Sequence, residues 1–198
     1  MDKELINMLD YKIHTNCELQ LYLANKNGRN KLNAVYSSID WIRTTIDEID
    51  IDNLRDDKRG PMWIRFINFI LCIDIMWEAI KQLHRVFINE KTEPFKEDHS
   101  IFKQKTPDNV YFKTIRACFA AHPINLTGVF DDDLENEIWF SFIPGSPEDS
   151  TDFCTSLLSN MPDRDGRMLV FYSNELYEFA KKRYEYLEVI IDNIDKVK

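Results

Sequence analysis

Apolar residues recur at steps of three and four positions along several long stretches of the chain. The clearest stripe lies within residues 31–49 and consists of Leu32, Val35, Tyr36, Ile39, Ile42, Ile46 and Ile49. This spacing places the apolar side chains on one face of an α-helix. Residues 3–26 carry apolar side chains at about every fourth position, and residues 61–89 are apolar on most sides, as in a helix at the centre of a bundle. We therefore expect helices over these three segments.

Two further helices are predicted in the second half of the chain. One spans about 108–122 and ends at Pro123, because a proline disfavours helical geometry in the residue before it. The other begins at Ser173, a residue type that caps helix N-termini, and runs nearly to the last residue. The segment 89–107 is polar with scattered prolines, which is typical of a long loop.

The period of the pattern changes between these two helices. Residues 137–143 alternate and are rich in β-branched and aromatic side chains, and residues 167–172 have a similar composition after the turn sequence DRDG. Both are predicted strands, and residues 126–130 are a candidate for a third. Between the two strands we expect a short helix that starts at Ser146 and Pro147 and contains Phe153, Leu157 and Leu158.

These elements predict a mainly α-helical fold, a bundle of about five helices with a small β-containing insertion before the last helix. A chain of 198 residues is expected to form a single domain, 1–198, with the insertion at 124–172. Hydrophobic residues make up 44% of the chain, which is enough to build a core without a disulfide or a metal. No internal repeat or linker interrupts it.

The charge and the cysteines restrict the partners and the compartment. A formal net charge of −9 disfavours non-specific binding to nucleic acid or anionic membranes, because phosphate contacts need clustered Lys and Arg, and we expect no DNA partner. The four cysteines lie far apart and are typical of reduced thiols in a cytoplasmic protein. The longest apolar stretch contains Arg65, Asp74 and Glu78, and the N-terminus has no apolar signal region, so no membrane segment is expected.

Most signatures of catalytic and metal sites are absent. The chain has no Gly-rich phosphate loop, no GxSxG and no HExxH, and we expect no cofactor or metal. The acidic run over 131–137 lacks the spacing of a calcium loop and is predicted to be a solvated loop, as is the acidic segment 47–57. Structural roles are expected for His14, His84 and His99, because none has a metal-spaced partner.

One constellation remains, KTIRACFAAHP at residues 113–123. It combines a permanent cation, Arg116, with a titratable imidazole, His122, near the end of one predicted helix. The dipole at a helix C-terminus favours the protonated imidazole, which suits a group that exchanges protons near neutral pH. The structural alternative is that Arg116 pairs with a carboxylate and His122 caps the helix end.

The stretch resembles the HEPN superfamily of helical domains, whose hallmark is an Arg followed four to six residues later by a His near a helix end. Five residues separate Arg116 from His122. The resemblance extends to the predicted architecture, since HEPN domains are bundles of four or five helices with the motif ahead of the last helix. By this resemblance Arg116 and His122 form the catalytic site of a metal-independent endoribonuclease acting on RNA, in a homodimer that serves defence or a toxin system.

One residue departs from the family pattern. Active members commonly carry a polar residue directly after the Arg, whereas this chain has Ala117. Either catalysis is reduced, or Lys113 or Thr114 takes the role of that residue. The resemblance is therefore also compatible with a non-catalytic domain that binds a nucleotide or a protein, and an unrelated helical domain is the third alternative.

Overall fold

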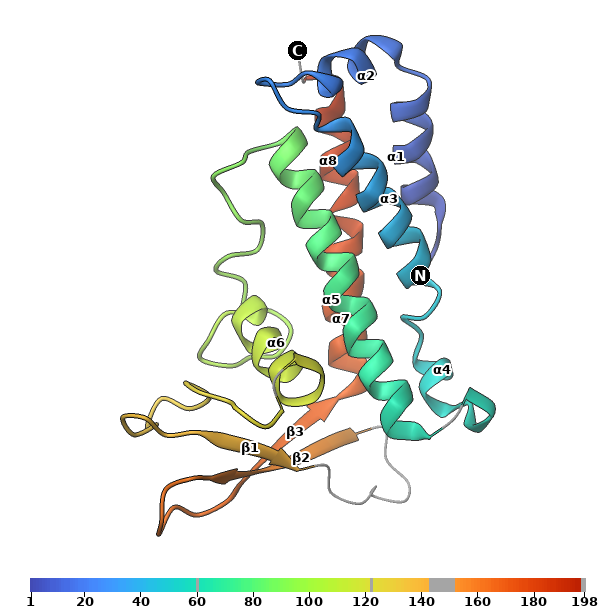
Figure 1. The fold of residues 1–198 in the computed structure, drawn as a ribbon. Coiled ribbons are helices and arrows are strands. Elements are labelled where there is room, and N and C mark those ends of the chain that lie inside the picture. Colours follow the sequence, from blue (N-terminus) through green and yellow to red (C-terminus); the bar gives the residue numbers. More distant parts are fainter. Residues whose placement is uncertain (60, 122, 143–151, 197–198) are drawn as a thin grey trace. The chain divides into compact units, whose positions relative to one another are not determined.

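The computed structural model describes residues 1–59, 61–121, 123–142 and 152–196. It is mainly α-helical, with a small three-stranded antiparallel sheet between α6 and α7 in the chain, which confirms the predicted class (Figure 1). The chain divides into two compact units. Unit 1 comprises Met1–Lys96 and Phe179–Lys198, and unit 2 comprises Glu97–Glu178. The expectation that residues 1–198 fold as a single domain stays a prediction.

The predicted helices are present, but several are shorter or interrupted. In the first half the helices are α1 (Glu4–His14), α2 (Cys17–Ala24), α3 (Leu32–Ile46), α4 (Ile51–Arg55) and α5 (Met62–Phe87), with a 3₁₀ turn at Asp57–Arg59. In the second half they are α6 (Asp108–Arg116), a π-helical turn (Ala117–Ala121), α7 (Ser173–Glu185) and α8 (Leu187–Ile194). Among these described helices, none combines the length and the apolar composition that crossing a bilayer requires.

The prediction of one continuous helix over 3–26 is wrong, because the chain breaks between α1 and α2. The side chain of Asn16 accepts a hydrogen bond from the backbone N–H of Leu19 at 3.0 Å and so caps α2. Asn at this position favours a helix start over continuation. The last predicted helix is likewise divided at Tyr186, and the acidic link after α3 contains α4.

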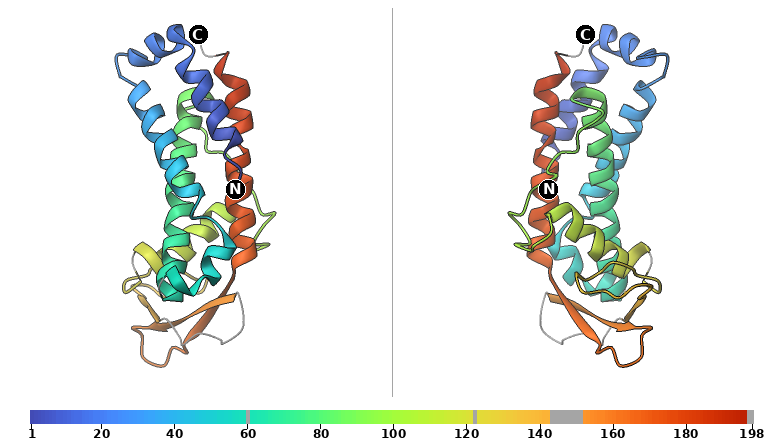
Figure 2. Two further views of the ribbon diagram at one scale, coloured as in Figure 1. Left: turned by 90° about the vertical axis from the view of Figure 1, so that its right-hand side faces the viewer. Right: turned by 90° about the vertical axis from the view of Figure 1, so that its left-hand side faces the viewer.

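Unit 1 is built around the long helix α5. Helix α3 packs along α5, and α1 and α5 both pack against α8, so segments from the two ends of the chain lie side by side (Figure 2). The stripe predicted on residues 31–49 forms the contact face of α3, where Val35, Ile39, Ile42 and Ile46 are at most 1% exposed. Burying each such side chain stabilises the fold by roughly 1.5–3 kcal/mol.

Unit 2 contains the sheet, in the order β1 (Trp139–Phe142), β2 (Asp152–Ser159) and β3 (Arg167–Tyr172), all antiparallel. Strands β1 and β3 confirm the strands predicted at 137–143 and 167–172 within the described residues. The third candidate, 126–130, is only an isolated bridge between Leu126 and Trp139.

The short helix predicted between the strands is wrong for the part of it that the structure describes, because Phe153, Leu157 and Leu158 lie in β2. Burial alternates along this strand, with Phe153, Thr155 and Leu157 at 0–3% exposure, as expected when one sheet face is covered. The spacing of these three apolar residues fits a helix and a strand equally well, and pairing with β1 and β3 decides between them.

Candidate functional site

Arg116 is the last residue of α6, and the residues around it are fixed by burial within unit 2. Phe112 and Ile115 on α6 are 2% and 1% exposed, so the apolar face of the helix is fully covered. Arg116 itself is half-buried. The helix therefore holds the start of the Arg116 side chain against the core while leaving part of the residue open to solvent.

The backbone changes its winding directly after Arg116. Residues Ala117–Ala121 form a π-helical turn, and Cys118 and Phe119 within it are buried. Burial raises the pKa of the Cys118 thiol to about 12, so this cysteine is inert at neutral pH. π-Helical turns are rare and are frequently found at functional sites, and the prediction of a single helix over 108–122 did not anticipate this one.

The sheet anchors this π-helical turn. The ring of Phe119 packs edge-on against that of Phe171 on β3, with 5.3 Å between the ring centroids. The chain beyond position 122 is also attached to the sheet, because the carbonyl of Pro123 accepts a hydrogen bond from the N–H of Ser141 at 2.7 Å. The β-containing segment thus supports the chain within the predicted motif, at Phe119, and directly after it, at Pro123.

His122 lies outside the described residues, so the structure places one member of the predicted pair. The neighbours of His122 that are described lie at the surface of unit 2: Ala121 is exposed and Ile124 is 73% exposed. The convergence of Arg116 and His122 on a phosphodiester stays a prediction.

The two residues considered as substitutes for a polar side chain at Ala117 differ in their surroundings. The hydroxyl of Thr114 donates to the carbonyl of Val110 at 3.4 Å and is thereby turned back onto its own helix. Lys113 is exposed in the last turn of α6, one turn before Arg116. Of the two, Lys113 has the side chain that is open to a ligand.

The acidic run over 131–137 is a structural ion-pair cluster, and the prediction of a solvated loop is wrong for its inner members. Glu137 is 2% exposed and its Oε1 lies 3.0 Å from Nε of Arg164. Asp132 pairs with Arg164 and Arg167, and the hydrogen bond from Arg167 lowers the pKa of the Asp132 carboxyl to about 2. Asp133 accepts from the indole N–H of Trp139 at 2.9 Å. These carboxylates fix the loop to the sheet.

His84 and Arg183 are buried in unit 1 and have structural surroundings. His84 hydrogen bonds through one ring nitrogen to the hydroxyl of Tyr186 and through the other to that of Thr92, both at 2.9 Å. Arg183 is fully buried and its guanidinium lies 3.8 Å from the ring centroid of Phe179 and 4.9 Å from that of Phe95. The structural role expected for His84 matches these contacts, whereas a buried Arg183 carries no signal in the sequence.

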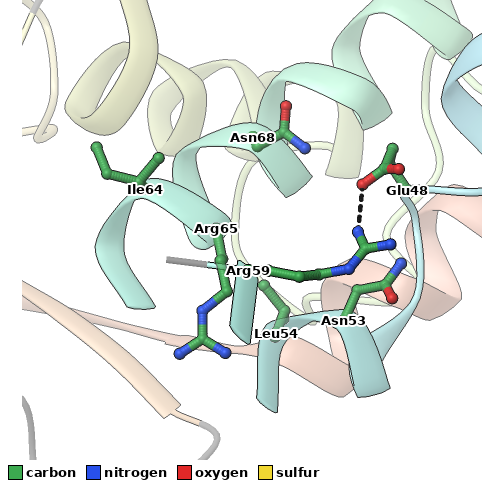
Figure 3. A pocket seen from close by; sticks show the side chains of 7 residues that line it. All are labelled: Glu48, Asn53, Leu54, Arg59, Ile64, Arg65 and Asn68. Atoms are coloured by element: carbon green, nitrogen blue, oxygen red, sulfur yellow. Dashed lines mark hydrogen bonds and ion pairs between the residues drawn. The ribbon is translucent and has the colours of Figure 1, made fainter. Parts of the chain in front are cut away.

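Unit 1 also contains a polar pocket of about 370 Å³ near the start of α5 (Figure 3). The guanidinium of Arg59 donates to Glu48 at 2.6 Å within it, and the guanidinium of Arg65 points away from that pair. The remaining lining residues are Asn53, Leu54, Ile64 and Asn68. The charged groups of the lining that meet each other thus form one ion pair, and the guanidinium of Arg59 is a donor of the kind that binds anionic ligands. The sequence did not indicate Arg59 or Arg65 as candidate site residues.

Within the part of the chain that the structure describes, no three His, Cys, Asp or Glu side chains come together as a metal site would require. No family model matches the chain, and comparison with curated proteins and with solved structures also finds no match.

Proposed function

We propose that this protein is a metal-independent endoribonuclease of the HEPN type, with Arg116 and His122 as its catalytic pair. If α1 is counted with α2 and α7 with α8 as interrupted helices, the described helices are compatible with the four or five of a HEPN domain, and the sheet precedes the last of them in the chain. The four cysteines are free thiols, which fits the reducing cytoplasm as its compartment.

The proposed reaction is attack by a ribose 2′-hydroxyl on the adjacent phosphodiester. His122 takes the proton of the 2′-hydroxyl while its oxygen forms a bond to phosphorus, and the bond from phosphorus to the 5′-oxygen breaks. The leaving 5′-oxygen takes a proton from water, the resulting hydroxide is neutralised by the proton that His122 holds, and the products are a 2′,3′-cyclic phosphate and a 5′-hydroxyl. The guanidinium of Arg116 stabilises the charge that develops on the phosphoryl oxygens.

The observation that carries the proposal is the position of Arg116 at the junction between α6 and the π-helical turn. It is half-buried, and the sheet holds the backbone after it through Phe119 and Pro123. A catalytic group needs this combination of a fixed backbone and a solvent-reachable side chain. The exposed Lys113 adds a second cation one helical turn away, where a phosphate backbone would be attracted.

The experiment is cleavage of a fluorescent RNA oligonucleotide by the full chain in the presence of a metal chelator. The proposal predicts cleavage that the chelator does not suppress and products that end in a 2′,3′-cyclic phosphate. The matched substrate carries 2′-deoxyribose at the cleaved position and is predicted to stay intact, because it lacks the nucleophile. Cleavage of the deoxy substrate at the same position, or activity only with added metal, contradicts the proposal.

A second candidate, binding of a nucleotide without catalysis, is favoured by the pocket that Arg59 lines together with Glu48. Ligand binding to the folded state raises the melting temperature. We expect AMP or ATP to raise it in the wild type and to have a smaller effect in Arg59→Gln, because that variant removes one guanidinium from the pocket. Arg55→Gln is the matched control, since Arg55 is exposed on α4 and does not line the pocket. If the nucleotide raises the melting temperature of both variants equally, it binds outside this pocket.

A further inference from the structure

Helix α3 carries a shallow furrow of about 590 Å³ on the side opposite its buried stripe. The residues that line it all belong to this helix and are Asn33, Tyr36, Ser37, Asp40, Trp41 and Thr44. At about 3.6 residues per turn, the four small polar side chains form a line along the helix, and the two aromatic side chains flank this line on opposite sides. The furrow therefore has a polar floor with an aromatic ring along each side.

The two aromatic residues of the furrow differ in their surroundings. Trp41 is 51% exposed, which is unusual because tryptophan is highly buried on average. Tyr36 is half-buried, and its ring packs against that of His14 on α1, with 5.1 Å between the centroids and 42° between the planes. One ring is thus held in place by a neighbouring helix, and the other offers its π-face to a ligand from solvent.

Asp40 places a carboxylate without a counter-ion on the floor of the furrow. Within the described part of the chain, this carboxylate has neither an ion pair nor a hydrogen bond. The one cation of α3 is Arg43, three positions further on, at a spacing where ion pairs form on a helix. The guanidinium of Arg43 is bound instead to Asp10 on α1, with 2.7 Å between Nη2 and Oδ2. The carboxylate of Asp40 is therefore left for a ligand.

The chemistry of the lining selects the class of ligand. Aromatic rings attract a cation to their faces, and a carboxylate beside them supplies the opposite charge, so the furrow suits an organic ammonium group. A Ca²⁺ or Mg²⁺ ion fits less well, because these ions need several oxygen ligands and the lining offers one carboxylate. An anionic ligand would meet the charge of Asp40 with no Lys or Arg among the lining residues.

We infer that the furrow on α3 binds a small quaternary ammonium compound, whose cationic head lies against Asp40 and Trp41. The amide of Asn33 and the hydroxyls of Ser37 and Thr44 supply hydrogen bonds for a polar tail. The site lies in unit 1 and shares no residue with the proposed nuclease pair or with the pocket at Arg59. Its failure and the failure of the nuclease proposal are therefore separate results.

The test is titration of the full chain with choline, followed by the NMR signals of the indole N–H groups. The signal of Trp41, assigned with Trp41→Phe, should shift and saturate at millimolar choline, because cation–π contacts at exposed sites are weak. The signals of Trp77 and Trp139 should stay in place, since these side chains are 3% and 0% exposed. Sodium chloride at the same concentration is the reference for ionic strength. The neutral isostere 3,3-dimethylbutan-1-ol should bind at least about tenfold more weakly, because it lacks the charge.

A pair of variants separates the charge of Asp40 from the shape of the furrow. Asp40→Asn keeps the shape and removes the charge, and it should weaken choline binding by about threefold or more. Asp52→Asn is the matched control, because Asp52 is an exposed acid on α4 outside the furrow, and it should bind choline like the wild type. A Trp41 signal that choline moves no more than sodium chloride does overturns the proposal. So does equal affinity for choline and its neutral isostere, or equal choline affinity in Asp40→Asn and the wild type.

Discussion

The ring of Phe119 meets the ring of Phe171 edge-on, with 5.3 Å between the centroids and 79° between the planes. The first residue belongs to the π-helical turn after Arg116 and the second to β3, so this contact joins the candidate site to the sheet. Aromatic pairs in this geometry contribute about 0.5–1.5 kcal/mol beyond the area that they bury.

Removing this contact is predicted to destabilise the protein strongly. Phe119→Ala leaves a cavity beside Phe171 and should lower the free energy of unfolding by about 3–5 kcal/mol. Urea denaturation followed by circular dichroism measures the change. Val110→Ala, at a position on α6 that is 46% exposed, is the control and should change it by about 0.5 kcal/mol or less. If both variants lost a similar amount of the free energy of unfolding, the contact between Phe119 and Phe171 would not anchor the π-helical turn.

The pH dependence of stability should include a contribution from His84. Desolvation lowers the pKa of its imidazole below 6.5, the charge of Arg85 lowers it further, and the hydrogen bond with Thr92 opposes both. Between the folded and unfolded pKa values the unfolded chain binds more protons, so the free energy of unfolding falls as the pH drops through 6.5 toward the folded value.

His84→Gln should therefore lose less stability than the wild type between about pH 8 and about pH 5, measured by urea denaturation at each pH. The variant is expected to be less stable than the wild type at the higher pH, because the contacts with Tyr186 and Thr92 are disturbed. His99→Gln is the control, since His99 is exposed in the loop after α5. If the free energy of unfolding changed with pH in the same way in the wild type and in His84→Gln, the pKa of the His84 imidazole would not be lowered as described.

The ion pair between Asp132, in the loop before β1, and Arg167, on β3, can be tested directly. The hydrogen bond from Arg167 is the main reason that the pKa of Asp132 falls from 3.8 to about 2, so the stabilisation is present above 3.8 and is lost as the pH falls through about 2. Arg167→Gln should raise this pKa toward 3.8, as measured by carbon NMR of the Asp132 carboxyl group. Arg55→Gln should leave it unchanged, and an unshifted pKa in Arg167→Gln would remove Arg167 as the cause.

The helical core could be predicted because it depends on local periodicity. The stripe that includes Ile39 and Ile42 predicts the buried face of α3, and the run of apolar and aromatic residues ending at Tyr172 predicts β3. Strand β2 was missed because Phe153 and Leu157 also fit a helical spacing, and only their partners in β1 and β3 select the extended form.

The site was predicted less completely than the fold for a similar reason. Arg116 stands out by its spacing from His122, but the π-helical winding after it depends on the packing of Phe119 against a residue 52 positions later. The pocket at Glu48 and Arg59 and the ion pair of Asp132 with Arg167 also join residues that no local pattern links.

The rate of RNA cleavage by single variants of the two motif residues tests the central claim most directly. Arg116→Ala and His122→Ala should each reduce chelator-resistant cleavage by about 100-fold or more, because each removes a group that acts in the transition state. His99→Ala should retain cleavage within about tenfold, and unchanged melting curves would show that all three variants are folded. Full activity in either Arg116→Ala or His122→Ala would contradict the account.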